Sequence, residues 1–356
     1  MVRKTFLLIA IISVLVGAVS LVSAQEPLIE SVCLVTDVGK VNDGTFNQFA
    51  FEGMDAAASD FDLESTYIET TAPTDYAPNI QRCIDSEYGA IITVGFLLQD
   101  ATLAAAEANP DVYFIGVDQG YEMAPENLVG VQFREDQSGF LAGALAAQMS
   151  ESGVIAGVYG IPVPAVVKFQ NGYEQGAKYI NPDIDARSVF IQSFTDPAQG
   201  AEAAEQLIAE GADVIFGAGG QTGSGAIQRA ATDEVYAIGV DQDEYFSTFG
   251  GGESPGAEYL ISSAMKRVDQ GVYLSIEALV EGDMEAFGGG GNRVLSAEND
   301  GVTFAPAHDS DVPEEVTATM EEILAGLKDG TIETGVDPVT GELLDMEMMP
   351  TEEASG

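Results

Sequence analysis

Short apolar runs alternate with longer segments of helical period along most of this 356-residue chain. The apolar runs predict strands at 31–36, 63–68, 90–94, 112–117, 154–158, 188–192, 213–216 and 236–240, with short extended segments at 128–132 and 258–262. Helices are expected over 45–59, 75–86, 99–108, 137–149, 165–179, 197–210, 222–232 and 263–280. Strands and helices that alternate at this spacing predict an α/β protein with parallel sheets covered by helices on both faces.

Two of the predicted strands end on nearly the same phrase. VYFIGVDQ begins at Val112 and VYAIGVDQ at Val235, and the likeness extends upstream to GAIITVGF from Gly89 and GADVIFGAG from Gly211. Each block reads as strand, turn, helix, strand and then Asp. One repeat of a βαβ unit excludes short-period arrays such as solenoids and propellers. The repeat favours two similar doubly wound lobes that face a shared cleft.

The two short extended segments lie where the chain is expected to change lobe. A third crossing is expected around 286–305, so that several strands form a hinge whose terminal residues absorb rotation. The predicted division places 25–132 plus 259–285 in the N-terminal lobe and 133–258 plus 286–336 in the C-terminal lobe. Residues 337–356 are polar without an apolar period and are expected to form a flexible tail.

The first 24 residues have the pattern of a signal peptide. Arg3 and Lys4 precede an apolar run, which Val22-Ser23-Ala24 closes as a small-residue cleavage site. The alternative is an uncleaved membrane anchor, because the run is close to the length that spans a bilayer. Either way the folded part is expected outside the cytoplasm, and no cysteine closes the run as a lipoprotein attachment site.

The charge balance limits the classes of partner. The chain has 58 Asp and Glu against 13 Lys and Arg, a net charge of −45. Such a field repels nucleic acid and anionic ligands, and it favours a neutral or cationic ligand. Much of the acid is also explained by a strongly solvated surface. An extracytoplasmic compartment permits a disulfide between Cys33 and Cys83, although two small buried thiols are an equal alternative.

The ends of the predicted strands carry the candidate binding residues. Ligands of open α/β sheets bind outside the carboxyl ends of the strands, where Asp37, Asp118 and Asp241 lie. A carboxylate there accepts two hydroxyls at once, which suits a vicinal diol such as that of ribose. A turn or helix N-cap role is the alternative for each Asp alone, and three equivalent positions make binding the better reading.

Aromatic and amide side chains near the same ends suit a flat ligand. Phe46, Phe169 and Phe216 are positioned to stack on a ring system, although core packing is the ordinary role of Phe. Asp43 and Asn47 are candidates for reading base edges or, equally, for turn and cap roles. The stretch that begins at Gly217 and includes Gly219 follows a strand, but it lacks dinucleotide-loop and P-loop spacing. It therefore predicts close backbone approach to a ligand without phosphate binding.

Catalytic patterns are weak in this sequence. The single histidine, His308, lies in a predicted loop near the C-terminus, no Cys/His cluster has metal-ligand spacing, and no Gly-x-Ser-x-Gly elbow occurs. We therefore expect a binding protein without a metal or cofactor. An enzyme such as a nucleoside hydrolase, with Asp37 and Asp43 at a metal, is the weaker alternative.

Several long motifs resemble one known family. NDGTFNQFAFEGM, GVDQ, FREDQSGFLAGALAA, FTDPAQGAEAAEQLIAEGADVIFGAGGQTGSG, AIGVDQDEY and ISSAMKRVDQGVY occur in order between Ser31 and Gly335. They are similar to the basic membrane protein family, the purine nucleoside receptor A-like substrate-binding proteins of ABC transporters. The resemblance implies a type I periplasmic-binding-protein fold with a nucleoside between the lobes, and a membrane permease as partner. Members are commonly lipoproteins, whereas no cysteine closes the apolar run of this chain.

The resemblance also assigns roles to the candidate residues. It places Asp118 and Asp241 on the ribose hydroxyls and Phe46 and Phe216 on either side of the base. Asp37, Asn47 and the backbone of Gly217 to Gly219 would lie near base or sugar, and Lys266 would reach the cleft. A monomer is expected. A sugar or other small polar ligand, or a sensor that delivers its ligand to a membrane receptor, stays open as an alternative.

Overall fold

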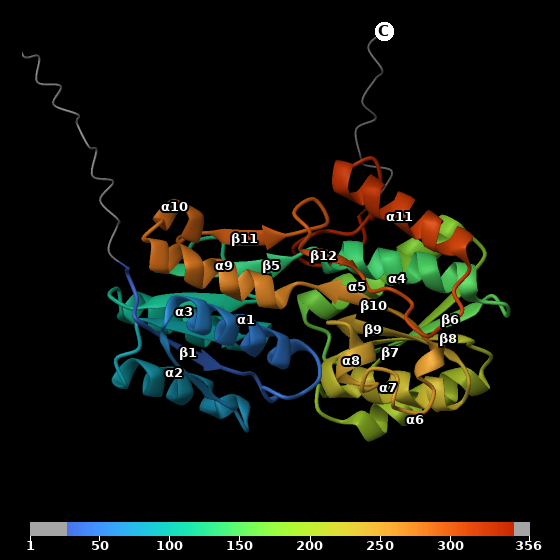
Figure 1. The fold of residues 1–356 in the computed structure, drawn as a ribbon, viewed down its shortest axis with the longest axis horizontal. Helices are drawn as coiled ribbons and strands as arrows, with labels where there is room; N and C mark the ends of the chain where they lie inside the picture. Colours follow the sequence, from blue (N-terminus) through green and yellow to red (C-terminus); the bar gives the residue numbers. More distant parts are fainter. Residues whose placement is uncertain (1–26, 345–356) are drawn as a thin grey trace, which may run out of the picture.

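The computed structural model describes residues 27–344, and the chain in this range forms two α/β lobes built on two six-stranded sheets (Figure 1). The first sheet has the order β11-β5-β4-β3-β1-β2 and is parallel throughout. Its strands are β1 (Ser31–Val35), β2 (Glu64–Ile68), β3 (Ala90–Val94), β4 (Tyr113–Val117), β5 (Leu128–Phe133) and β11 (Asn292–Leu295). Its helices are α1 (Phe46–Phe61), α2 (Tyr76–Asp85), α3 (Gln99–Ala108), α9 (Val268–Glu281) and α10 (Met284–Phe287).

The second lobe repeats this arrangement. Its sheet has the order β12-β10-β9-β8-β6-β7, and only the β10–β12 pair is antiparallel. The strands are β6 (Val154–Tyr159), β7 (Asp185–Phe190), β8 (Val214–Ala218), β9 (Tyr236–Asp241), β10 (Leu260–Lys266) and β12 (Val302–Phe304). The helices are α4 (Glu135–Met149), α5 (Pro164–Ile180), α6 (Pro197–Ala209), α7 (Gly220–Thr232), α8 (Glu244–Ser247) and α11 (Glu314–Asp329). The predicted pair of doubly wound parallel sheets is confirmed.

Both sheets are covered on both faces because their strands are apolar on both sides. In the first lobe α1 and α9 pack together, and α2 and α3 pack together on a separate apolar cluster. In the second lobe α4 packs against α5, and α6 against α7. Central strands such as β3 and β8 are buried along their whole length, as parallel strands between two helix layers should be. Between the two layers of each lobe, the carboxyl ends of the strands remain accessible to a ligand.

The chain changes lobe at three places, and two boundaries of the predicted lobe division differ from the structure. The crossings lie at Arg134 between β5 and α4, at Arg267 between β10 and α9, and between β11 and β12. β10 belongs to the second sheet and β11 to the first, whereas the prediction placed 259–285 in the first lobe and 286–336 in the second. The sequence Ser-Ser-Ala-Met after Ile261 suits a helix, but pairing with β9 keeps the strand extended to Lys266.

The first part of the predicted tail is folded. Val336 pairs with Leu343, Leu344 donates its N–H to the Gly335 carbonyl at 2.9 Å, and the Gly341 carbonyl accepts from the Asn171 side chain on α5 at 2.6 Å. Backbone hydrogen bonds thus order 335–344, and the Asn171 side chain attaches this segment to α5, although the sequence has no apolar period there. The predicted signal peptide at 1–24 and the tail residues 345–356 lie outside the described residues. No helix within 27–344 is long and apolar enough to cross a membrane.

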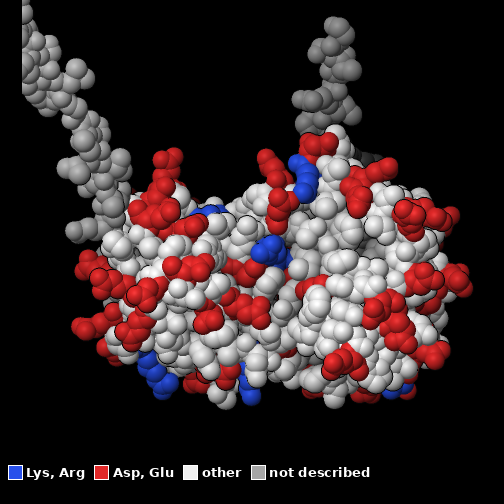
Figure 2. Space-filling view, in the orientation of Figure 1, with Lys and Arg blue, Asp and Glu red and all other residues white. Residues whose placement is uncertain are grey.

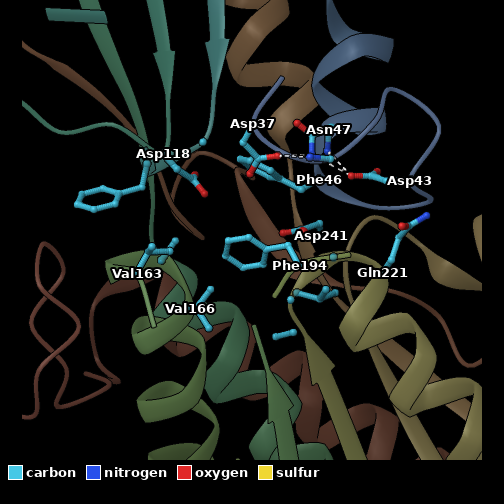
Figure 3. A pocket seen from close by; sticks show the side chains of 18 of the residues that line it. Asp37, Asp43, Phe46, Asn47, Asp118, Val163, Val166, Phe194, Gln221 and Asp241 are labelled. Atoms are coloured by element: carbon cyan, nitrogen blue, oxygen red, sulfur yellow. Dashed lines mark hydrogen bonds between the residues drawn. The ribbon is translucent and has the colours of Figure 1, made fainter. Parts of the chain in front are cut away.

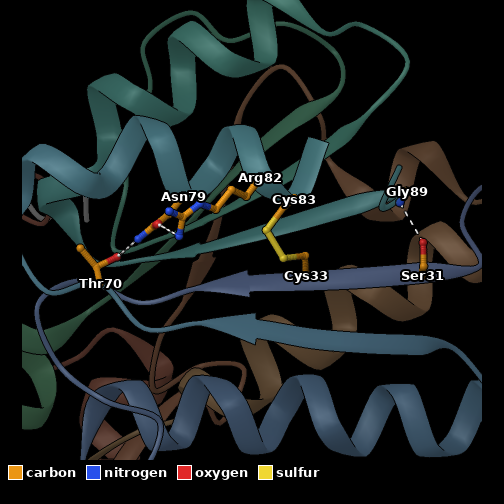
Figure 4. The surroundings of a disulfide bond; sticks show 7 residues. All are labelled: Ser31, Cys33, Thr70, Asn79, Arg82, Cys83 and Gly89. Carbon is orange, nitrogen blue, oxygen red and sulfur yellow. Dashed lines mark hydrogen bonds between the residues drawn. A yellow bond between two sulfur atoms is a disulfide. The ribbon is translucent and has the colours of Figure 1, made fainter. Parts of the chain in front are cut away.

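The two cysteines form a disulfide in the first lobe (Figure 4). Cys33 on β1 and Cys83 on α2 have Cα atoms 6.0 Å apart, and both are buried in the apolar cluster between the sheet and α2. The bridge closes a loop with a sequence separation of 50. The chain-entropy relation gives about 4 kcal/mol of stabilisation for such a loop, as an upper value. The structure thus contains a disulfide between Cys33 and Cys83 and not two separate buried thiols.

Candidate functional site

A cavity lies between the two lobes at the carboxyl ends of their strands. Every predicted binding residue except Phe216 and Gly217 lines it (Figure 3). Its polar and aromatic lining consists of Asp37, Asp43, Phe46, Asn47, Phe96, Asp118, Phe169, Phe194, Thr195, Gln221, Asp241 and Lys266, with Gly219 among the backbone contacts. Both lobes supply acidic and aromatic groups, so a ligand in this cavity touches both.

The two repeated phrases each place one Asp at this cavity. Asp118 follows β4 with φ 58° and Asp241 ends β9 with φ 65°, so both residues adopt the left-handed backbone conformation, which is uncommon outside glycine. Asp118 Oδ2 accepts from Lys266 Nζ at 2.6 Å, and its Oδ1 is buried without a hydrogen-bond partner among residues 27–344. Burial raises the pKa of Asp241 to about 7, because the nearby Lys266 only partly offsets it. Each lobe therefore aims one carboxylate at the same space.

A second polar group forms where β1 meets the start of α1. Asn47 Nδ2 donates to Asp37 Oδ1 and to Asp43 Oδ2, each at 3.0 Å, while Asn47 Oδ1 is buried without a partner among the described residues. Asp43 also accepts backbone N–H groups in the first turn of α1, so the cap reading and the lining reading both hold for it. Burial raises the pKa of Asp37 to about 6, against opposing hydrogen bonds from Gly39 and Asn47. This group can exchange hydrogen bonds with the edge of a flat ligand.

Lys266 lies at the centre of the site although it is only 1% exposed. Its ammonium is 2.6 Å from Asp118 and 3.0 Å from Glu135, and 4.8 Å from the ring centre of Phe46. Burial alone would lower the pKa of this ammonium, but the carboxylates of Asp118, Glu135 and Asp241 outweigh it and raise the pKa. The side chain is therefore charged and offsets part of the negative charge in the cavity.

Two predicted residues lie outside the cavity. The Phe216 side chain is fully buried in the core, where its ring stacks on Tyr173 with centroids 5.1 Å apart. Gly217 allows close packing of α7 on β8, since a Cβ there would lie 2.4 Å from the Gly223 carbonyl oxygen. In a strand whose two faces are both buried, sequence alone does not say which face looks toward the ligand. The proposed stacking role of Phe216 and ligand contact at Gly217 are not supported by these positions.

Phe194 is the aromatic residue that the sequence reasoning missed. It lies in the loop between β7 and α6, lines the cavity from the second lobe, and is close to Gly160, where a Cβ would lie 2.4 Å from its ring. Phe46 lines the same cavity from the first lobe (Figure 3). The signal available in the sequence was an aromatic residue just before the Thr-Asp-Pro start of a helix. Its return to the cleft depends on the loop path, which no local pattern specifies.

The two lobes are in contact beside the cavity, so the structure has the lobes in a closed arrangement. Gln242 Nε2 donates to the Thr45 carbonyl at 3.3 Å, and Ser247 Oγ donates to the Gly44 carbonyl at 2.7 Å. Both contacts join the segment after β9 to the loop before α1. A ligand that favours this arrangement would be enclosed by the loop from the first lobe.

Comparison with known proteins identifies the sequence relatives of the chain. The profile of the Bmp family, described as ABC transporter substrate-binding protein PnrA-like, matches residues 30–333. An ABC transporter nucleoside-binding protein BmpA of Lactococcus lactis subsp. cremoris is 32% identical over 66% of this chain and 70% of its own length. Basic membrane protein A of Borreliella afzelii is 34% identical over 63% of this chain and 70% of its own length.

Solved structures match the two-lobe architecture. A solute-binding protein of an ABC transporter system from Aeropyrum pernix K1 has a TM-score of 0.74 at 24% identity, over 85% of this chain and 92% of that chain. A periplasmic ribose ABC transporter protein from Conexibacter woesei has a TM-score of 0.59 at 17% identity, over 85% and 96%. At these identities the likeness concerns the fold alone, which is that of type I periplasmic binding proteins.

Proposed function

We propose, on the premise that this chain belongs to the Bmp family of PnrA-like ABC transporter substrate-binding proteins, that it binds a nucleoside between its lobes and presents it to a membrane permease for import. One observation carries the proposal. Asp118 and Asp241 end equivalent strands of opposite lobes and line one cavity. A ligand with two neighbouring hydroxyls can donate to both carboxylates only when the lobes are closed.

The sugar end of the ligand would lie between these carboxylates. Each ionised carboxylate has two acceptor oxygens, and hydrogen bonds to charged groups contribute about 1.5–3 kcal/mol each. The Asp118 Oδ1 atom lacks a partner among the described residues and offers one such acceptor. Figure 2 shows Asp and Glu spread over both lobes. This negative surface disfavours a phosphorylated ligand, because the phosphate is negatively charged too.

The base would lie between Phe46 and Phe194, which line the cavity from different lobes. Asp37 and Asn47 lie beside this space and can bond to ring and exocyclic nitrogens of a base. The aromatic walls and this polar edge suit the flat two-ring system of a purine. We therefore favour a purine nucleoside, in line with the nucleoside-binding relative from Lactococcus lactis.

Transport follows from closure. A ligand that contacts both lobes stabilises the closed arrangement by its differential affinity for it, and a permease can recognise the resulting surface. The protein would act as a monomer outside the cytoplasm, delivered by the leader at 1–24, which the apolar pattern of the sequence supports. Nothing in this role requires catalysis, a metal or a cofactor.

A thermal-shift screen of residues 25–356 tests the proposal. The panel contains purine and pyrimidine nucleosides, free bases, ribose and common sugars, because a ligand that binds the native state raises the unfolding midpoint with its concentration. We expect shifts with purine nucleosides at concentrations where ribose and free bases give none. Shifts with sugars alone, or with no compound, would overturn the nucleoside assignment.

A sugar or other small polar ligand is the second candidate, since the two carboxylates alone would also suit a sugar diol. The variant Phe194→Ala separates a nucleoside from a sugar, and Phe216→Ala is its comparison variant in the core. If a base stacks on Phe194, Phe194→Ala costs about 1–3 kcal/mol of nucleoside affinity. Phe216→Ala should instead cost about 3–5 kcal/mol of stability through the cavity it leaves in the core. Unchanged affinity in Phe194→Ala, measured by titration calorimetry, would favour the sugar reading.

A further inference from the structure

The two strand-to-helix crossings share a second repeated phrase, Arg-x-Asp-Gln, which begins at Arg134 and again at Arg267. The two arginines have nearly equal backbone angles, φ −88° and ψ 64° at Arg134 and φ −77° and ψ 64° at Arg267. Each donates through Nε at 2.8 Å and through Nη2 at 2.7 Å to the carboxylate two residues later, Asp136 or Asp269. The two crossings therefore have the same local geometry.

The third crossing segment joins both of them. The backbone N–H of Arg134 donates to the Leu295 carbonyl at 2.9 Å, and that of Arg267 donates to the Gly301 carbonyl at 2.9 Å. Leu295 ends β11, and Gly301 directly precedes β12. The third connection between the lobes is thus hydrogen-bonded to each of the other two.

One position breaks the symmetry of the repeat. The residue after the arginine is Val268 in one crossing, where it is buried in the apolar core, and Glu135 in the other. Glu135 is 1% exposed, and its carboxylate is 3.0 Å from Lys266 Nζ and 2.5 Å from Lys168 Nζ. Burial alone would raise the pKa of Glu135, but the two ammonium groups lower it below its ordinary value. A buried carboxylate at this place needs a reason beyond hinge geometry, because its desolvation is costly.

The contacts of Glu135 continue into the ligand cavity. Asp118, Lys266, Glu135 and Lys168 form a chain of alternating charge, and Lys168 Nζ also donates to the Phe133 carbonyl at 2.8 Å. The chain contains two carboxylates and two ammonium groups, so its charges balance. Lys266 Nζ donates to Asp118 Oδ2 at 2.6 Å, forms an ion pair with Glu135 at 3.0 Å, and lines the cavity.

We propose that Glu135 is a positioning residue of the ligand site, which holds the Lys266 ammonium toward the ligand, and that Lys168 holds Glu135 in turn. The proposal rests on the proposed function, since it needs a ligand in the cavity. Lys266 directly precedes one crossing and Glu135 directly follows another. Their contact therefore joins two hinge connections, and a change of lobe angle that parts them also moves the Lys266 ammonium away from Asp118 and the ligand.

Variants that remove the buried pair as a unit test this role. Glu135→Leu combined with Lys168→Met replaces two buried charges by apolar groups of similar length, a change that is often neutral for stability. We expect the unfolding midpoint to stay near that of the wild type while the nucleoside Kd weakens at least tenfold, because the Lys266 ammonium has lost the Glu135 oxygen that lies 3.0 Å from it. Glu135→Gln combined with Lys168→Met keeps an oxygen that accepts from Lys266, so its Kd should recover to within about threefold of the wild-type value.

The control and the contrary outcomes are specific. Arg229→Met with Asp233→Asn removes an ion pair at the end of α7, outside all three crossings, and it should change neither Kd nor midpoint appreciably. If Glu135→Leu with Lys168→Met binds the nucleoside within twofold of the wild type, Glu135 has no positioning role. The same follows if this variant and Glu135→Gln with Lys168→Met bind the nucleoside equally weakly. If the first double variant does not fold, Glu135→Ala with Lys168→Met takes its place, and a Kd equal to that of Glu135→Gln with Lys168→Met would sink the proposal. A wild-type chain that binds no nucleoside would overturn the proposed function first, so the two failures are distinct.

Discussion

The two strand ends that carry the repeated IGVDQ phrase are alike in backbone and different in partners. Asp118 and Asp241 both have a left-handed backbone, but Asp118 forms an ion pair with Lys266 at 2.6 Å, while burial raises the pKa of Asp241 to about 7. Gln119 bonds within its own lobe, to Thr93 and to the Gly95 carbonyl, whereas Gln242 reaches the other lobe. The first strand end thus supplies an ion-paired carboxylate, and the second supplies an acceptor whose ionisation burial opposes and a contact between the lobes.

Substitution of the two carboxylates should give the largest contrast. Asp118→Asn leaves Lys266 with one carboxylate fewer in a buried place, and we expect a stability loss of about 3 kcal/mol, at the low end for a broken buried pair because Glu135 still pairs with Lys266. Asp241→Asn removes a carboxyl whose ionisation burial opposes, so stability at pH 8 should not fall. Each variant should also lose about 1.5–3 kcal/mol of nucleoside affinity. Urea unfolding and titration calorimetry measure both quantities, and equal stability losses would remove the contrast.

The raised pKa of Asp241 predicts opposite effects of pH on binding and on folding. A carboxylate that accepts hydroxyls must be ionised, so nucleoside affinity should rise with pH through about 7 and be about tenfold weaker at pH 6 than at pH 8. The stability of the ligand-free protein should change the other way. The pKa values of Asp37, Asp241 and Glu244 are raised to about 6, 7 and 7, so the folded state binds more protons than the unfolded chain. The stability that these groups contribute is complete below about pH 4 and is lost as pH rises through 6 and 7.

Calorimetric titrations and unfolding at matched pH values test both signs. Asp241→Asn is the control for binding, because its affinity should be nearly independent of pH over this range. A wild-type affinity that does not change between pH 6 and pH 8 would show that Asp241 does not accept a hydrogen bond as an anion.

The smallest expected effect concerns the two glutamines of the same phrase. Gln242→Ala removes a single hydrogen bond between the lobes, so we expect about 0.5–1.5 kcal/mol less nucleoside affinity and little change in stability. Gln119→Ala removes buried hydrogen bonds within the first lobe, so stability should fall by about 1–3 kcal/mol while affinity stays within about twofold. Identical profiles for the two variants would mean that the repeated glutamines have one common role.

The sequence predicted those parts of the molecule that a repeat or a period encodes. The second IGVDQ placed Asp118 and Asp241 at equivalent strand ends, and the apolar runs predicted both sheets. The pattern did not decide which way Phe216 points, because β8 is apolar on both faces. It also did not show that Phe194 returns to the cavity or that β10 continues to Lys266, since a loop path and strand pairing decide these. The Glu135 chain joins residues that lie far apart in sequence, and no local pattern signals it.

The most direct test of the shared diol site compares one ligand with and without its hydroxyls. Titration calorimetry at pH 8 with the best purine nucleoside and with its 2′,3′-dideoxy analogue measures what the two carboxylates contribute. If Asp118 and Asp241 bind the two hydroxyls from opposite lobes, the analogue should lose about 3 kcal/mol or more, roughly a hundredfold in Kd. Equal affinity for the two compounds would contradict the account.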